Sequence, residues 1–554
     1  MHRRLLAVAS VLLFALPAPP SRGAPVAALP VPVGYVAASG ADFAAMRRSG
    51  ARAVRLVADW SVIEADPGVF QWTELDRAVA AAARVGLTVT LVLAFTPRWA
   101  SLASGAELDD PAIWSRQPPR PAHLADWQRF VEAAAQRYRG RVREWQVWTV
   151  LTLPIWRGTA REYFALVAAA RTATKAVDPQ NRIILATPAG ADLIAVRRAV
   201  REIPDAFDAV SLSPKHLAPE ALLRPLGTLR DRVLDGRRKG LRLEWDPRAA
   251  GGRAAWGVHI AKVLTVAAAF GVERVDLVAD PSIASPVLEA VAAATGGAPF
   301  AGYLSQGRAL AFVFGRTAPS AIVWSAEGEA TIAFDGEGLS VSTLAGAPVA
   351  ATGSGGRTAV TVGAEPVIVK GLPAAVAEAA EAALAADPAP VFPPARDYSR
   401  AAAVTARLGR VNVEEGLYNM PFRARAGAVE PVQVAGAEAV RTNAAKEIVY
   451  VYFDIDDSFI YYVDGRYAVE ITVEVLGASA PDQVGFNIFY DSMTDLRFTR
   501  RQIVEAKEGW VTYSIRLLDA AFANTWGWDF AINAAGNRAE DLTVRTVTVR
   551  KLPR

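Results

Sequence analysis

The stretch that decides the fold is Leu75-Asp-Arg-Ala-Val-Ala-Ala-Ala-Ala-Arg-Val85-Gly86-Leu87-Thr-Val-Thr-Leu-Val-Leu-Ala-Phe95. Residues 75–85 place apolar side chains at helical spacing, and Gly86 is a residue that commonly ends a helix. Residues 87–95 then form an apolar run of strand length. A helix followed at once by an apolar strand predicts one unit of a layered α/β fold, in which the strand is buried on both faces.

The same unit recurs on both sides of this stretch. Strands are expected at 31–36, 53–57, 87–95, 145–148, 183–186, 207–212, 241–245 and 275–278, with helices between most of them. Such alternation predicts parallel strands joined by right-handed crossovers, and eight units close into a (β/α)8 TIM barrel. The expected fold class is therefore α/β, with a barrel over 30–298 whose functional residues follow the carboxyl ends of the strands.

The rest of the chain is predicted to be rich in β-strands. Short strands separated by Gly-rich turns predict a small β-sandwich over 299–372. Residues 373–396 combine a helical piece with five prolines, which indicates a linker. Strands dominate again over 397–554, where a β-sandwich of jelly-roll type, similar to a carbohydrate-binding module, is expected.

The amino terminus has the pattern of a secretory signal peptide. Met1-His-Arg-Arg4 is basic, an apolar run follows over 5–16, and small residues and prolines follow that run. We therefore expect residues 1–24 to be a signal peptide and the protein to be secreted or extracytoplasmic, at the cell surface or in a periplasm. A retained amino-terminal anchor is the alternative, and no later stretch is long and apolar enough to span a bilayer.

Composition narrows the function classes. Sixty Lys and Arg face 56 Asp and Glu, and no long basic run occurs, so nucleic-acid binding is not expected. The absence of cysteine excludes disulfides and thiolate catalysis, and four histidines make a histidine-rich metal site improbable. We expect no cofactor in the barrel. A structural Ca²⁺ or the rim of a sugar site is suggested by Asp454-Ile-Asp456-Asp457 and Tyr490-Asp491-Ser492, with ordinary turn chemistry as the alternative.

Several motifs occur in order along the first half of the chain. They are Ala53-Val-Arg55-Leu-Val-Ala-Asp-Trp60, Pro67-Gly-Val-Phe-Gln-Trp72, Thr96-Pro-Arg-Trp99 and Trp145-Gln-Val-Trp148. Together they resemble clan A retaining glycoside hydrolases, most closely the β-xylosidase/α-iduronidase-like family and relatives that act on exopolysaccharides. The resemblance implies a barrel with two catalytic carboxylates, and a polysaccharide or oligosaccharide as the partner.

One of those carboxylates is missing at its expected place. The resemblance implies a Trp-Asn-Glu-Pro-type motif at the end of the fourth strand, where Glu is the general acid/base. Here Thr149 stands at the Asn position and Val150 stands at the Glu position. Valine neither donates nor accepts a proton, so the acid/base position is degenerate.

The other half of the site is retained. Glu244, at the end of the seventh strand, matches the nucleophile position of the resembled clan, and Arg55 matches the arginine that keeps this nucleophile ionised. On the sixth strand, Ser213 replaces an expected His and Lys215 replaces an expected Tyr. His216 is expected to be a loop residue.

Tryptophans near strand ends are candidates for stacking on sugar rings, since a flat apolar indole suits the C–H face of a pyranose. We assign Trp99, Trp148, Trp156 and Trp245, with Ser213 and Lys215, to a candidate substrate-binding set. Core packing is the alternative for each tryptophan. Glu64 is expected at the surface or in a loop, and Glu144 at the far end of the barrel, where it is poorly placed to replace the missing acid.

Three functions are consistent with these observations. The first is an exported glycan-binding protein with lost or much reduced hydrolysis. The second is an active retaining hydrolase with Glu244 as nucleophile and an unidentified acid, and the third is a non-catalytic scaffold in exopolysaccharide machinery. The fold alone does not distinguish them.

Overall fold

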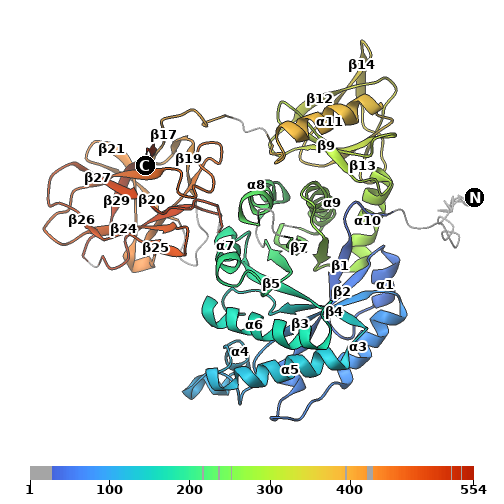
Figure 1. Ribbon diagram of the computed structural model, residues 1–554. Helices are drawn as coiled ribbons and strands as arrows, with labels where there is room; N and C mark the ends of the chain where they lie inside the picture. Colours follow the sequence, from blue (N-terminus) through green and yellow to red (C-terminus); the bar gives the residue numbers. More distant parts are fainter. Residues whose placement is uncertain are drawn as a thin grey trace, which may run out of the picture.

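The computed structural model describes residues 28–214, 217–234, 238–250, 252–392, 396–420, 428–525, 527–537 and 539–553. Figure 1 shows a central barrel flanked by two β-rich domains, the small domain that contains β9 (Phe300–Gln306) to β16 (Val367–Lys370) and the carboxyl-terminal domain. The expected signal peptide, Lys215 and His216 lie outside the described residues.

Eight parallel strands form a closed barrel in sequence order, which confirms the predicted fold class. The strands are β1 (Val33–Val36), β2 (Ala53–Asp59), β3 (Thr88–Ala94), β4 (Val142–Val147), β5 (Arg182–Ala189), β6 (Ala209–Ser213), β7 (Gly240–Trp245) and β8 (Arg274–Leu277). Pairing of β1 with both β2 and β8 closes the ring. The apolar run that decided the fold is β3, which is buried along almost its whole length.

Helices surround the barrel, as expected for crossovers between parallel strands (Figure 1). They are α1 (Phe43–Arg48), α2 (Trp60–Ile63), α3 (Thr73–Arg84), α4 (Pro111–Trp114), α5 (Leu124–Arg137), α6 (Ala160–Val177), α7 (Leu193–Glu202), α8 (Leu223–Thr228), α9 (Arg253–Ala269) and α10 (Pro281–Thr295). The side chain of Asp192 caps the amino end of α7 by accepting a hydrogen bond from Ala195 N at 2.8 Å.

Part of the barrel interior is ionic. Glu144 accepts hydrogen bonds from Arg242 on β7 and from Arg274 Nη1 on β8, the latter at 2.9 Å. Thr90 donates to Glu144 at 2.7 Å, and Arg274 Nε lies 2.7 Å from Asp276 Oδ1. Charges removed from water in this way are tolerated because each has a partner of opposite sign.

The small domain follows α10. Its sheets have the orders β13-β16-β11-β10-β9 and β12-β15-β14. The strands are β9 (Phe300–Gln306), β10 (Ala309–Phe314), β11 (Ser320–Ser325), β12 (Ala330–Asp335), β13 (Ser340–Thr343), β14 (Ala351–Ser354), β15 (Arg357–Val362) and β16 (Val367–Lys370). β10 is buried on both faces, because Leu310 and Phe312 join the barrel's apolar core whereas Ala311 and Val313 join the small domain's own core.

The predicted linker needs a correction. Residues 374–386 form α11 (Ala374–Ala386), and Val376, Ala377 and Ala380 belong to the core of the small domain. The close approach of β9 to α11 is visible at Gly302, where an added Cβ would meet Ala380 O at 2.1 Å. Burying these apolar side chains ties α11 to the small sheets, so this part of the expected linker belongs to that domain.

The carboxyl-terminal domain consists of two mainly antiparallel sheets. One has the order β18-β17-β29-β21-β20, with β23 joined to β29 and β27 joined to β23. The other has the order β19-β22-β28-β24-β25, with β26 joined to β24. Its strands are β17 (Ala403–Arg407), β18 (Val413–Glu415), β19 (Leu417–Met420), β20 (Glu430–Val434), β21 (Ala437–Arg441), β22 (Tyr450–Ile455), β23 (Ala468–Leu476), β24 (Gly485–Asp491), β25 (Leu496–Phe498), β26 (Gln502–Ile503), β27 (Trp510–Leu517), β28 (Phe530–Asn533) and β29 (Thr543–Leu552). Strand β23 alternates buried and half-buried residues, the pattern of a strand with one face on a core.

Ion pairs join this domain to the barrel. Asp464 lies 3.2 Å from Arg197 Nη2 and 3.3 Å from Arg232 Nη2, and Asp457 lies 3.2 Å from Arg224 Nε. We call the contact region between the barrel and the carboxyl-terminal domain the junction. Among the described residues, no helix has the length and apolar character needed to cross a membrane.

Candidate functional site

Glu244 stands near the carboxyl end of β7 and is held by two neighbouring strands. Its Oε2 lies 2.5 Å from Arg55 Nη2 of β2, and its Oε1 accepts a hydrogen bond from Ser213 Oγ of β6 at 3.3 Å. The side chain of Arg55 is 2% exposed and that of Glu244 is 13% exposed. The three residues therefore form one ion-paired and hydrogen-bonded group that is fixed in position with limited access to water.

The segment after β4 keeps an unusual backbone although it lacks an acid. Trp148 has φ of +63° and Phe95, which follows β3, has φ of +65°. Bulky residues seldom adopt this left-handed region, and such strained positions concentrate at functional sites. Gln146 Nε2 holds the segment by donating to Trp148 O at 2.9 Å and to Thr149 O at 3.3 Å.

Val150 and Thr149 therefore lie in an ordered turn. Val150 is buried, with 5% of its surface exposed, and Leu151 N bonds to Thr187 O of β5 at 3.0 Å. Tyr163 of α6 supports both strands, because its hydroxyl donates to Val147 O at 2.9 Å and accepts from Ala186 N at 2.8 Å. An aliphatic side chain thus occupies the position expected for an acid, within a well-supported backbone.

The candidate tryptophans are packed more tightly than stacking platforms need to be. Trp148 is fully buried, and its ring meets that of Trp156 edge-on with centroids 4.8 Å apart. Trp245 is 2% exposed and Trp156 is 5% exposed. Trp99 is half-buried and donates from Nε1 to Glu64 O at 3.0 Å. In this arrangement Trp148 and Trp245 pack as core residues and present no open ring face to a sugar.

Glu144 and Glu64 are the other two glutamates of the barrel whose positions were predicted from the sequence. Burial opposes ionisation of Glu144, but Arg242 and Arg274 outweigh it and hold the pKa of Glu144 far below its usual value. A carboxylate that stays ionised in this way is unsuited to donate a proton. Glu64 lies in the turn after α2, as expected for a loop residue, but it is fully buried and not at the surface. It accepts from Trp60 Nε1 and Arg129 Nη2, each at 2.7 Å.

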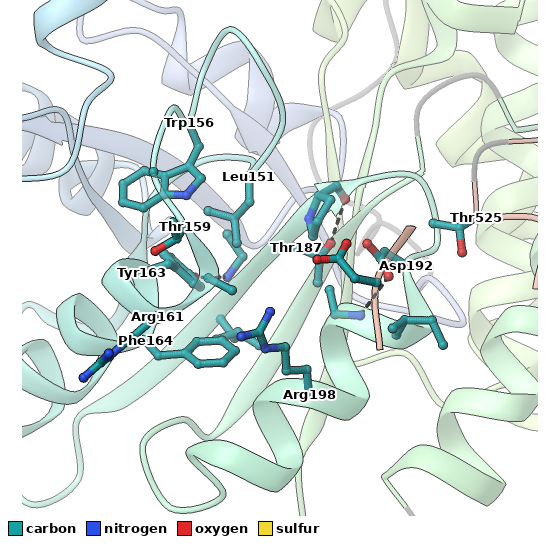
Figure 2. Close-up of a pocket in the computed structure, with 18 of the residues that line it drawn as sticks. Leu151, Trp156, Thr159, Arg161, Tyr163, Phe164, Thr187, Asp192, Arg198 and Thr525 are labelled. Atoms are coloured by element: carbon teal, nitrogen blue, oxygen red, sulfur yellow. Dashed lines mark hydrogen bonds between the residues drawn. The ribbon is translucent and has the colours of Figure 1, made fainter. Parts of the chain in front are cut away.

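A pocket lies at the junction, and two of its lining residues, Trp156 and Asp491, belong to segments that the sequence suggested for sugar binding. It has a volume of about 650 Å³ and is lined from the barrel by residues around β5, α6 and α7, and from the other domain by residues after β24 and near Thr525 (Figure 2). Two deeply buried carboxyl groups, Asp192 and Asp491, line it from opposite sides of the junction. Asp491 belongs to the segment Tyr490-Asp491-Ser492, which the sequence suggested as the rim of a sugar or Ca²⁺ site, whereas no local motif marks Asp192.

Burial and, to a smaller degree, the nearby charge of Asp192 raise the pKa of Asp491 to about 7, and a hydrogen bond from Thr525 partly offsets the rise. Burial likewise raises the pKa of Asp192 to about 6, partly offset by backbone N–H groups of α7. The neighbouring Asp454 and Asp529 also have raised pKa values because they are buried together. In the described part of the chain, no three His, Cys, Asp or Glu side chains are grouped in a way that could hold a metal ion.

Comparison with known proteins places the barrel among glycoside hydrolase structures. No protein-family model matches the sequence, and the search of curated proteins finds no match. A family 39 glycoside hydrolase from the gut symbiont Bacteroides cellulosilyticus WH2 is similar in structure, with a TM-score of 0.50 and 14% identity over 62% of this chain and 81% of that chain. A GH30 endoxylanase from Clostridium papyrosolvens C71 gives a TM-score of 0.44 and 12% identity over 62% of this chain and 96% of that chain. The chain therefore has the fold of the clan A glycoside hydrolases.

Proposed function

We propose that this protein is an exported, glycoside-hydrolase-like protein that binds a polysaccharide or oligosaccharide with lost or much reduced hydrolysis. The observation that carries the proposal is the contrast between Glu244, which is ion-paired with Arg55, and Val150, a buried aliphatic side chain where the resemblance implies the acid/base. A retaining mechanism needs two carboxyl groups about 5 Å apart. Among the described residues, only Arg55 and Ser213 are in ion-pair or hydrogen-bond contact with Glu244.

The charge balance also favours binding over proton transfer. Glu144, also within the barrel, is neutralised by two arginines, so it does not supply the missing proton. A fixed carboxylate such as Glu244 accepts hydrogen bonds from sugar hydroxyls without any chemistry. The proposed export rests on the signal-peptide pattern of the amino terminus. A Ca²⁺ ion in the carboxyl-terminal domain is proposed only in a structural role.

The second candidate is an active retaining hydrolase, which the Glu244–Arg55 ion pair favours. A nucleophile without its acid still attacks a substrate whose leaving group needs no protonation. A scaffold role is the third candidate, and it is favoured by the packed state of Trp148 and Trp245.

Binding is tested by affinity electrophoresis in gels containing xylan or a bacterial exopolysaccharide. The proposal expects retardation of the wild-type protein, weaker retardation of Glu244→Gln, and no change for Glu74→Gln, an exposed glutamate on α3. Equal migration of all three proteins in every gel would count against a glycan site at Glu244.

The acid/base position is tested by the double substitution Val150→Glu with Thr149→Asn. A positioned general acid contributes about 10²–10⁴-fold to rate, so the double variant is expected to cleave xylobiose faster than the wild type. The same variant should change little with a 2,4-dinitrophenyl glycoside, whose leaving group needs no acid. No gain on xylobiose would indicate that the loss extends beyond Val150.

A further inference from the structure

The junction pocket is built by both domains, and Glu244 is not among the residues that line it. Its volume of about 650 Å³ lies within the range of small-ligand sites. From the barrel, Trp156, Phe164 and Leu151 give it an apolar wall, and Thr187 and Thr525 supply hydroxyls from the two domains. Figure 2 shows Trp156, Phe164 and Asp192 around one space, with Thr525 approaching from the other domain.

Close contact of the two domains fixes this geometry. Gly190 follows β5 with φ of +103°, and a Cβ added there would meet Thr525 O at 2.5 Å. Only glycine allows the barrel loop to come this near to the loop of the carboxyl-terminal domain. Asp192, two residues later, is thereby brought to the same pocket as Asp491.

In the described part of the chain, neither aspartate has an ion-pair partner. Asp192 is 8% exposed and is bonded to backbone N–H groups of its own helix, including Ala195 N at 2.8 Å. Asp491 is 3% exposed and accepts from Thr525 Oγ1 at 3.0 Å. Among the described residues, no Lys, Arg or His nitrogen lies within 4.0 Å of either carboxylate.

The two arginines that line the pocket, Arg161 and Arg198, are not counter-ions of the aspartates. Arg198 Nε is paired with Glu202 Oε1 at 2.8 Å, and its guanidinium lies 5.9 Å from the centre of the Phe164 ring. Arg161 is exposed. The buried acidic side of the pocket therefore has no counter-charge among the residues that the structure describes, and a buried charge is costly until it is paired.

The geometry favours an organic ammonium over a metal ion. No three carboxylates or histidines of the described residues are grouped to hold a metal. An ammonium group needs fewer carboxylates than a metal ion, because its three N–H donors can be shared between two carboxylates and one hydroxyl. The apolar wall opposite suits the C–H face of a sugar ring that carries this group.

We propose that the junction pocket binds a saccharide with a free amino group, which Asp192 and Asp491 recognise as an ammonium. The saccharide part of this inference rests on the proposed function, whereas the amino group rests on the two aspartates. The site is composite, since neither domain alone supplies both carboxylates.

The test is isothermal titration with the glucosamine hexamer and with the N-acetylglucosamine hexamer, which has the same backbone but no charge. The full-length protein should bind the glucosamine hexamer at pH 7.5 and bind the acetylated one at least about tenfold more weakly, because a buried charge pair is lost. Binding of the glucosamine hexamer should weaken toward pH 5, as the two carboxyl groups take up protons.

Asp192→Asn, Asp491→Asn and the exposed control Asp482→Asn complete the design. The first two should each weaken binding at least about tenfold, while the control should not. Asparagine also caps helices well, so loss of binding by Asp192→Asn with an unchanged melting temperature separates recognition from folding. Glu244→Gln should leave this binding intact, so failure at the Glu244 site and failure at the junction are told apart.

Three results would overturn the proposal. One is equal affinity for the two hexamers, and another is equal affinity of Asp491→Asn and the wild type for the glucosamine hexamer. The third is Ca²⁺ binding that both aspartate variants abolish, because that result would assign the carboxylates to a metal.

Discussion

The barrel interior and the junction both bury carboxyl groups, but they balance the charge in opposite ways. Inside the barrel, Glu144 is paired with Arg242 and Arg274, and Glu244 with Arg55. In the junction pocket, the nearby charge of Asp192 opposes ionisation of Asp491, and among the described residues no cation is paired with either. The pKa of Glu144 is therefore far below its usual value, whereas those of Asp192 and Asp491 lie near neutrality. The carboxylates that are ion-paired with arginine stabilise the barrel, whereas Asp192 and Asp491, which have no ion-pair partner among the described residues, are available to a ligand.

The largest effect is expected from breaking the paired region. Glu144→Ala leaves Arg242 and Arg274 buried without their shared partner, which costs about 3–5 kcal/mol of unfolding free energy. Urea unfolding measures the change, with Glu74→Gln, which breaks only the exposed pair with Arg77, as the control. A loss no larger than that of the control would mean that the interior ion pairs contribute little.

A change of opposite sign is expected at the junction. Between about pH 4 and pH 7, folded Asp491 holds a proton that the unfolded chain has released, so the stability of the wild type falls as pH rises through this window. Asp491→Asn cannot ionise and should be more stable than the wild type at pH 8 by about 2 kcal/mol, with little difference at pH 4. Melting curves at both pH values give the comparison, and a destabilised variant at pH 8 would contradict the account.

Gly190→Ala tests the approach of the two domains with a smaller effect. The added methyl meets Thr525 O and the residue has a positive φ, so we expect a loss of about 1–2 kcal/mol and a looser junction. Limited proteolysis of the segment between α11 and β17 should become faster. Unchanged stability and cleavage would show that the loops separate at little cost.

The barrel could be predicted from the sequence because each strand is a short apolar run and each helix has a regular apolar spacing. The Glu244–Arg55 pair followed from a resemblance that places both residues at strand positions, and the structure brings them together. The helix over residues 374–386 was predicted, but it was placed in a linker because an Ala-rich stretch beside prolines resembles one, whereas its burial depends on the small sheets.

Other features depend on contacts between distant parts of the chain. The burial of Glu64 comes from Arg129 and Trp60, and the sequence around Glu64 resembles any loop. A tryptophan near a strand end can stack on a sugar or pack in the core, and the sequence does not distinguish the two. Trp148 packs in the core because of neighbours such as Phe95, which the sequence does not place beside it. The junction pocket joins a helix cap of the barrel to a strand end of another domain, so no local pattern predicts it.

The central claim is that Glu244 is the remaining half of a hydrolase site that now serves binding. The most direct measurement is product release by mass spectrometry from xylan, xylobiose and a panel of 4-nitrophenyl glycosides, with the wild type and Glu244→Gln side by side. The account predicts no turnover of the polysaccharide or the disaccharide by either protein, together with retained binding by the wild type. Wild-type turnover of these substrates that Glu244→Gln abolishes would contradict it.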